Sequence, residues 1–164
     1  MDIIIDGYNL IGGDQGLRGA LEQKRNRLIQ QLSMYKERKG FGIIVVFDGW
    51  RSGWGHEVEE KRDGVNVIYS RQGEKADDVI VRLARRKGSG CVIVTSDREV
   101  RRAVEKFGAA AVYANEFSAM LRSLDYPTVA DDDDPAPAEP RTGNPRRLSK
   151  TERRRQDKLK KLQP

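Results

Sequence analysis

The sequence predicts an α/β fold, a three-layer α/β/α sandwich with a mainly parallel central sheet. Its short apolar runs lack the polar alternation of half-exposed strands, which is typical of strands covered on both faces. Between these runs, apolar residues recur at the spacing of amphipathic helices. Gly40, Gly88, Gly90 and Gly108 stand where a helix would turn into the next strand, a position that favours glycine. The predicted order of elements is β-α-β-β-α-β-α-β-α.

Each element can be placed along the chain. Strands are expected at residues 3–5, 43–47, 65–69, 92–94 and 109–113, where isoleucine, valine and alanine dominate. Helices are expected around residues 17–32, 76–84 and 100–107, where apolar residues recur every three or four positions. Residues 49–64 show neither pattern, and we expect them to form one long irregular stretch. Trp50 and Trp54 stand among glycines there and are expected outside the core.

Composition limits the class of protein. The chain has 164 residues and a formal charge of +6, which suits one ordinary domain with its own core. A single cysteine, Cys91, excludes a disulfide framework, and a single histidine, His56, excludes a zinc site rich in histidine and cysteine. Any metal must then be held by oxygen. No apolar run approaches the roughly 20 residues that cross a bilayer. Asp2 is acidic and stands where a signal peptide would carry positive charge. We expect a cytoplasmic protein without a membrane segment.

The end of the chain divides into an acidic and a basic segment. Residues 131–140 contain five acidic residues and no basic one, whereas residues 141–164 contain ten basic residues and two acidic ones. The expected parts are a folded domain at 1–126, an acidic Pro/Ala-rich linker with the start of the basic tail at 127–148, and a basic tail at 149–164. Ser149 and Glu152 have the spacing of a capping box, which predicts a short helix within a flexible charged tail. The alternative is a disordered, solubilising tail.

Acidic residues follow nearly every predicted strand. Asp6, Asp48 and Asp97 follow the first, second and fourth strands, and Asp77 and Asp78 open the helix after the third. In an open parallel sheet these positions meet at the carboxyl edge, where such folds place their sites. Two carboxylates about 4 Å apart repel by roughly 4 kcal/mol at an effective dielectric constant of about 20. Such a cluster favours a cation, and with oxygen ligands the ion would be Mg²⁺ or Mn²⁺.

Each acidic residue also has a simpler interpretation. An aspartate after a strand is commonly the N-cap of the next helix, where its carboxylate accepts hydrogen bonds from free N–H groups. Asp97 and either Asp77 or Asp78 fit that role. Asn9, one turn after Asp6, can be a neutral ligand or an ordinary turn residue. Capping explains any one of these residues more easily than it explains all of them together.

The motifs of other α/β sites are absent from the sequence. It contains no G-x-x-x-x-G-K-[ST] phosphate loop, no G-x-G-x-x-G dinucleotide motif and no G-x-S-x-G nucleophile elbow. None of the later predicted strands ends in the lysine that phosphoaspartate chemistry needs. Metal-assisted hydrolysis of a phosphodiester remains.

Four runs carry the motifs of a known family. They are residues 6–10 (Asp-Gly-Tyr-Asn-Leu), 47–49 (Phe-Asp-Gly), 76–80 (Ala-Asp-Asp-Val-Ile) and 94–97 (Val-Thr-Ser-Asp). In this order and spacing they resemble the YacP-like branch of the NYN domains, which are PIN-related ribonucleases. The resemblance covers roughly residues 1–125, and the chain from residue 131 onward lies outside it. Because the characterised member is a ribosome-associated endoribonuclease that cuts mRNA in the ribosomal A site, the resemblance implies that type of activity.

The resemblance also implies roles for individual residues. The principal catalytic and metal-binding carboxylates would be Asp6, Asp77 and Asp97, and the further candidate ligands Asp48 and Asp78. Asn9 and Ser96 would line the same pocket. Lys75 stands where the family is expected to have a small hydroxyl residue, and a lysine there can contact a phosphate or weaken metal binding.

Basic and aromatic residues near this edge and in the tail are candidates for RNA binding. Arginine and lysine neutralise phosphates, and each tryptophan that stacks on an unpaired base contributes about 1–3 kcal/mol. The alternatives are a solvated surface for the basic residues and packing against the body for the tryptophans. The candidates are Trp50, Arg51, Trp54, His56, Arg71, Lys75, Arg153, Arg154 and Arg155.

These observations favour a metal-dependent endoribonuclease that hydrolyses single-stranded RNA, with Mg²⁺ or Mn²⁺ as cofactor and mRNA and the ribosome as partners. The alternative is a catalytically silent RNA- or ribosome-binding module whose acids serve as caps. A phosphatase or nucleotide hydrolase is a more distant third.

If the tail is a tether whose extended acidic spacer reaches about 30 Å, deleting residues 131–164 should leave cleavage of short RNA nearly unchanged.

Overall fold

The computed structural model describes residues 1–12, 18–49, 55–125 and 149–163. At its centre is a six-stranded sheet with the order β3-β4-β2-β1-β5-β6, in which all neighbouring strands are parallel except β3 and β4. The strands are β1 (Asp2–Asp6), β2 (Gly42–Phe47), β3 (Val58–Arg62), β4 (Val65–Tyr69), β5 (Cys91–Val94) and β6 (Ala110–Val112). The helices are α1 (Gly7–Ile11), α2 (Arg18–Lys39), α3 (Ala76–Lys87), the 3-10 helix η2 (Gly88–Gly90), α4 (Arg98–Lys106), α5 (Ala114–Asp125) and α6 (Lys150–Leu162). Within the described ranges, no helix combines the length and apolar character needed to cross a bilayer.

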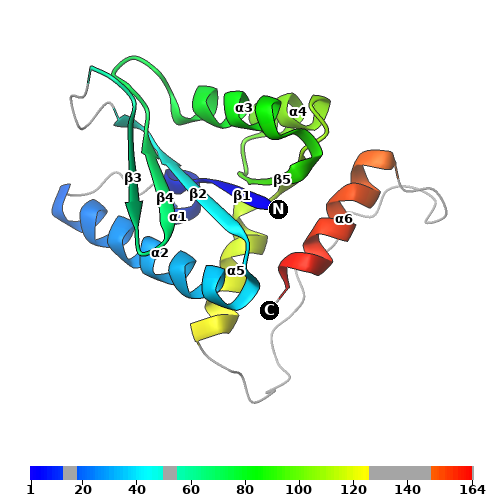
Figure 1. Ribbon diagram of the computed structural model, residues 1–164, viewed down its shortest axis with the longest axis horizontal. Coiled ribbons are helices and arrows are strands. Elements are labelled where there is room, and N and C mark those ends of the chain that lie inside the picture. Colours follow the sequence, from blue (N-terminus) through cyan, green and yellow to red (C-terminus); the bar gives the residue numbers. More distant parts are fainter. Residues whose placement is uncertain (13–17, 50–54, 126–148, 164) are drawn as a thin grey trace.

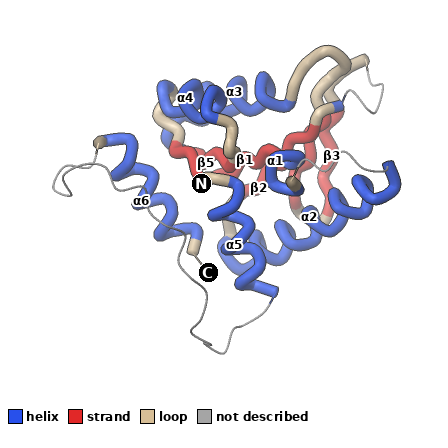
Figure 2. The backbone as a smooth tube through the Cα atoms, turned by 180° about the vertical axis from the view of Figure 1, so that it is seen from behind, coloured by secondary structure: helices blue, strands red, loops and turns tan. Residues whose placement is uncertain are grey.

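Helices cover both faces of the sheet, with α3 and α4 on one face and α1, α2 and α5 on the other (Figures 1 and 2). Successive strand residues point to opposite faces. Ile3 and Ile5 of β1 accordingly join a buried cluster with α2 and α5, whereas Ile4 joins a second cluster with α3 and α4. The central strands are apolar on both faces for this reason. The predicted α/β/α sandwich with a mainly parallel sheet is confirmed.

The expectation that residues 49–64 form one irregular stretch is wrong at its carboxyl end. β3 occupies Val58–Arg62 and pairs antiparallel with β4 as a hairpin. Its sequence is charged because it is an exposed edge strand, and charges on an edge discourage pairing with other sheets. The overlooked signal is the dipeptide Asp63-Gly64, whose φ angles of 49° and 80° suit a tight hairpin turn.

Residues 150–162 form a docked helix rather than a free tail. The Ser149 hydroxyl accepts a 3.1 Å hydrogen bond from the backbone N–H of Glu152 and so caps α6, which confirms the predicted helix. α6 flanks the β5–β6 side of the sheet (Figure 1), and Leu162 is fully buried in the cluster of α2 and α5. The Tyr35 hydroxyl donates a 2.7 Å hydrogen bond to the Leu162 carbonyl. A flexible or disordered state is therefore the wrong expectation for this segment, because its narrow apolar stripe reaches the core.

Candidate active site

Four aspartates meet at the carboxyl edge of the sheet. Asp6 ends β1, Asp48 follows β2, and Asp97 precedes α4 just after β5, while Asp77 lies in the first turn of α3. β1 lies between β2 and β5 in the sheet. The negative charges of Asp48, Asp77 and Asp97 all act on Asp6, so the fold brings these four carboxylates together.

Burial and neighbouring charges disfavour the ionised forms of the buried Asp6 and the half-buried Asp77. Asp6 is 8% exposed. Its burial, together with the charges of the three neighbouring aspartates, raises its pKa to about 6, although the hydrogen bond from the Asn9 N–H acts in the opposite direction. Burial and then the charges of Asp97 and Asp48 raise the pKa of Asp77, while Lys75 lowers it. A cation placed among these groups would relieve their mutual repulsion.

Two of the aspartates also serve as helix caps, namely Asp97, as the simpler interpretation predicts, and Asp6. The Oδ1 atom of Asp6 accepts a hydrogen bond from the backbone N–H of Asn9, 3.1 Å away, at the start of α1. The Oδ1 atom of Asp97 accepts from Glu99 at 2.7 Å and from Val100 at 3.1 Å at the start of α4. Among the described residues, neither Oδ2 atom accepts a hydrogen bond. Capping thus orients these carboxylates and leaves one oxygen of each for another partner.

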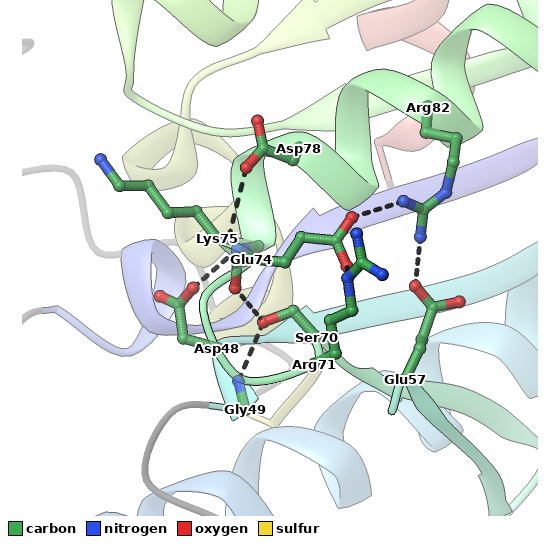
Figure 3. Close-up of polar contacts among 10 residues, drawn as sticks. Asp48, Gly49, Glu57, Ser70, Arg71, Glu74, Lys75, Asp78 and Arg82 are labelled. Carbon is green, nitrogen blue, oxygen red and sulfur yellow. Dashed lines mark hydrogen bonds and ion pairs between the residues drawn. The ribbon is translucent and has the colours of Figure 1, made fainter. Parts of the chain in front are cut away.

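A hydrogen-bond network holds Asp48 against the first turn of α3 (Figure 3). Asp48 Oδ1 accepts a 2.6 Å hydrogen bond from the backbone N–H of Ala76. The Ser70 hydroxyl accepts from the N–H of Gly49 at 3.0 Å and donates to the carbonyl of Glu74 at 2.7 Å. These bonds tie the end of β2 to the loop that leads into α3.

This network depends on a glycine, and Gly49→Ala is expected to disrupt it. A Cβ atom at Gly49 would overlap the carbonyl oxygen of Ser70. Because backbone atoms would have to move, we expect a loss of about 3 kcal/mol or more in the free energy of unfolding, measured by urea denaturation. Gly55→Ala is the matched control, since no described heavy atom lies within 4 Å of its Cβ position. Equal midpoints for the two variants would contradict the close packing at Gly49.

Lys75 and Asp78 have separate positions at the start of α3. Asp78 is exposed, and its Oδ2 atom accepts a 3.3 Å hydrogen bond from the backbone N–H of Lys75 in a capping box. The exposed Lys75 side chain lines an open pocket of about 330 Å³ together with Asp77 and Asp97, between the first turns of α3 and α4. Lys75 therefore supplies positive charge beside the acidic edge, whereas Asp78 acts as a cap.

Asn9 and Ser96 link neighbouring elements of the edge. The side-chain carbonyl of Asn9 accepts a 3.0 Å hydrogen bond from the backbone N–H of Ser96. The Ser96 hydroxyl accepts a 3.3 Å hydrogen bond from the N–H of Ala114 at the start of α5. The two residues thus hold α1, the loop after β5, and α5 in register around the aspartates.

The candidate RNA-binding residues are dispersed. His56 and Arg71 are exposed, and Arg71 forms an ion pair with Glu74 at 3.6 Å. Trp50, Arg51 and Trp54 lie outside the described residues.

The three arginines predicted on α6 differ in environment. Arg153 and Arg154 are exposed. The Arg155 side chain is only 15% exposed and pairs with Glu116 at 2.5 Å and Glu152 at 2.9 Å. Arg155 thus fastens α6 to α5, a role that the sequence did not reveal.

The donors at the edge suit a hard cation. Within the described residues, no three Asp, Glu, His or Cys side chains lie close enough to hold an ion among themselves. Mg²⁺ is commonly held by one or two carboxylates, with waters and substrate phosphate oxygens as its other ligands. Carboxylates drawn from Asp6, Asp77 and Asp97 fit this open arrangement, and oxygen ligands fit Mg²⁺ or Mn²⁺.

Comparisons with known proteins agree with this architecture. The curated protein YacP of Bacillus subtilis (strain 168), described as uncharacterized, is 37% identical to this chain over 90 residues. The match covers 52% of this chain and 52% of that relative, so the chain spans about half of the relative's length. Two crystal structures of Rae1 (YacP) from Bacillus subtilis, one of them a mutant, have TM-scores of 0.62 and 0.61 at 27% identity. Both cover 76% of this chain, and the matches cover 76% and 75% of the Rae1 chains.

A family-level match extends further along the sequence. The profile of the YacP-like NYN domain matches residues 3–162. The expected limit of the resemblance near residue 125 is therefore too short, in keeping with the packing of α6 on the core. The chain belongs to the YacP-like NYN domain family.

Proposed function

We propose that this protein is a metal-dependent endoribonuclease that hydrolyses single-stranded RNA. The proposal rests on one observation above all, the buried Asp6 carboxylate facing three other aspartates at one sheet edge. Membership of a PIN-related, nuclease-like family supports the reaction class. The resemblance to the family further suggests mRNA as substrate, association with the ribosome, and a cytoplasmic location.

The roles of the residues follow from their positions. A bound Mg²⁺ or Mn²⁺ would lower the pKa of a water molecule and screen the charge that develops on the phosphate. Asp6, Asp77 and Asp97 supply the candidate carboxylates, one or two of which would hold the ion directly, with water and substrate phosphate oxygens as its other ligands. Asp6 or Asp97 also orients the attacking water or accepts its proton. Lys75, on the rim beside Asp77, contacts a phosphate oxygen of the substrate.

Cleavage of a labelled, unstructured RNA during a Mn²⁺ titration tests the proposal. We expect no cleavage in EDTA and saturable cleavage with Mn²⁺. Asp77→Asn should lower the rate by about a hundredfold or more, because it removes a charged metal ligand without removing a cap. Glu59→Gln is the control, since Glu59 is an exposed carboxylate on β3. Cleavage that is insensitive to Mn²⁺ and to Asp77→Asn would refute the metal site.

A silent RNA-binding module is the second candidate, and the capping bonds of Asp6 and Asp97 favour it. In that case the aspartates only begin helices. The wild-type protein would bind RNA without cutting it at any Mn²⁺ concentration, and the same titration would therefore identify this alternative.

A further inference from the structure

A second site for substrate is suggested by a groove on the face of the sheet opposite α3 and α4. It has a volume of about 230 Å³ and is lined by residues of α2, of α5 and of the end of α1. These three helices lie on the same side of the sheet (Figure 2). Lys24 and Arg27 of α2 and Arg122 of α5 line the groove. Arg27 and Arg122 are exposed, and Lys24 is half-buried. Within the described chain no acidic side chain lines this α2–α5 groove, so it is a local concentration of positive charge.

The other lining residues indicate what kind of anion fits. Leu10, Ile11, Leu28 and Leu121 give the groove an apolar floor. Leu28 and Leu121 belong to the core, whereas Leu10 and Ile11 are only partly buried. Cations above an apolar surface suit a chain that alternates phosphates with flat bases. An acidic peptide would match the charge but offers fewer flat apolar groups to the floor.

The helix α1 connects the acidic edge to the groove along the chain. This helix begins directly after Asp6 and ends at Ile11, which lines the groove. Five helical residues span about 7.5 Å, so a strand of a few nucleotides can reach both places. The acidic edge itself repels phosphates, and RNA therefore needs cationic contacts close by.

We propose that the α2–α5 groove binds single-stranded RNA on one side of the scissile phosphate. This inference rests on the proposed nuclease function, because that function places the scissile phosphate at the acidic edge. Binding to the groove requires no cleavage, however, and can be measured without metal.

The test measures binding of a labelled, unstructured 12-nucleotide RNA to the full-length protein in EDTA over a series of salt concentrations. The double variant Arg27→Gln/Arg122→Gln should bind roughly tenfold to thirtyfold more weakly at about 0.1 M salt. Its slope of log K against log[salt] should be about 1.4 shallower, since about 0.7 is lost for each phosphate contact to a single strand. Arg27→Lys/Arg122→Lys keeps both charges and should restore most of the affinity and slope.

The matched control is Arg85→Gln/Arg102→Gln, which removes two exposed arginines from α3 and α4 on the opposite face of the sheet. It should change affinity much less than the groove variant. Equal affinity and slope for the groove variant and the wild type would overturn the proposal. So would poly-glutamate that competes with RNA for the wild type as strongly as unlabelled RNA does, because the occupant would then be an acidic peptide. A wild type that binds RNA through the groove but never cleaves it would refute the nuclease function and still support the groove.

Discussion

Asp6→Asn is expected to lower RNA cleavage by about a hundredfold or more and, in the absence of metal at neutral pH, to make the fold more stable. The two effects have the same cause. Asp6 is nearly buried among three other aspartates, and its pKa is raised from 3.8 to about 6. Keeping this carboxylate ionised at pH 7 therefore costs the folded protein up to about 3 kcal/mol relative to the unfolded chain. Asparagine removes the charge and remains a good N-cap for α1.

The pH dependence of stability has a definite sign. Between pH 3.8 and about 6 the folded protein holds the Asp6 proton more tightly than the unfolded chain does. The wild type should therefore lose stability as pH rises through this window, and the stabilising contribution is fully present only below it. Asp6→Asn should lack this decline. Urea denaturation of both proteins from about pH 4 to 7, in EDTA, measures the difference.

Divalent metal should remove most of the difference in stability between the two proteins. At a concentration of Mn²⁺ about 100 times its dissociation constant, binding stabilises the wild type by about 2.7 kcal/mol. The variant has lost a charged ligand and should gain much less. If Asp6→Asn cleaves RNA at the wild-type rate, Asp6 does not belong to the catalytic site. If the variant is less stable than the wild type at pH 7 without metal, the ionised Asp6 carboxylate does not destabilise the folded protein.

The sequence predicts most of the parallel sheet because strands buried on both faces, such as residues 43–47, are apolar without interruption. The same rule misses β3, since an edge strand is charged and only its Asp63-Gly64 turn marks it. The apolar pattern also fails to show that α6 docks on the core, because only two leucines, Leu159 and Leu162, make the contact. An apolar stripe this narrow is common to free and docked helices alike.

The gathering of acids could be anticipated because parallel strands bring their carboxyl ends to one edge. The bonds that position these acids could not. Asn9 pairs with Ser96, 87 residues away, and Asp48 with Ala76, 28 residues away. No local pattern specifies such partners. The cations of the α2–α5 groove were missed for the same reason, since Arg27 and Arg122 become neighbours of one pocket only through the packing of α2 and α5.

Leu162→Ala is expected to destabilise the whole domain by about 2–5 kcal/mol, the usual range for truncating a buried leucine. Leu162 is 0% exposed and lies in the same cluster as Phe117 and Leu121 of α5. Tyr35→Phe should cost about 1–3 kcal/mol, because it leaves the buried carbonyl of Leu162 without the donor that now lies 2.7 Å away. Urea denaturation measures both effects, and Lys160→Ala, on the exposed side of α6, is the control.

These variants also decide between a docked helix and a free tether. If α6 were a tether, Leu162→Ala and Lys160→Ala would unfold at the wild-type urea concentration, and deletion of residues 131–164 would leave an intact domain. Docking predicts instead that the deletion exposes the Leu162 site and the Tyr35 hydroxyl, so that loss of activity after truncation would report unfolding rather than lost RNA contacts. The exposed charges of Arg153 and Arg154 are then held at fixed positions on the body. Their contribution to RNA binding must be measured with point substitutions in the otherwise intact helix.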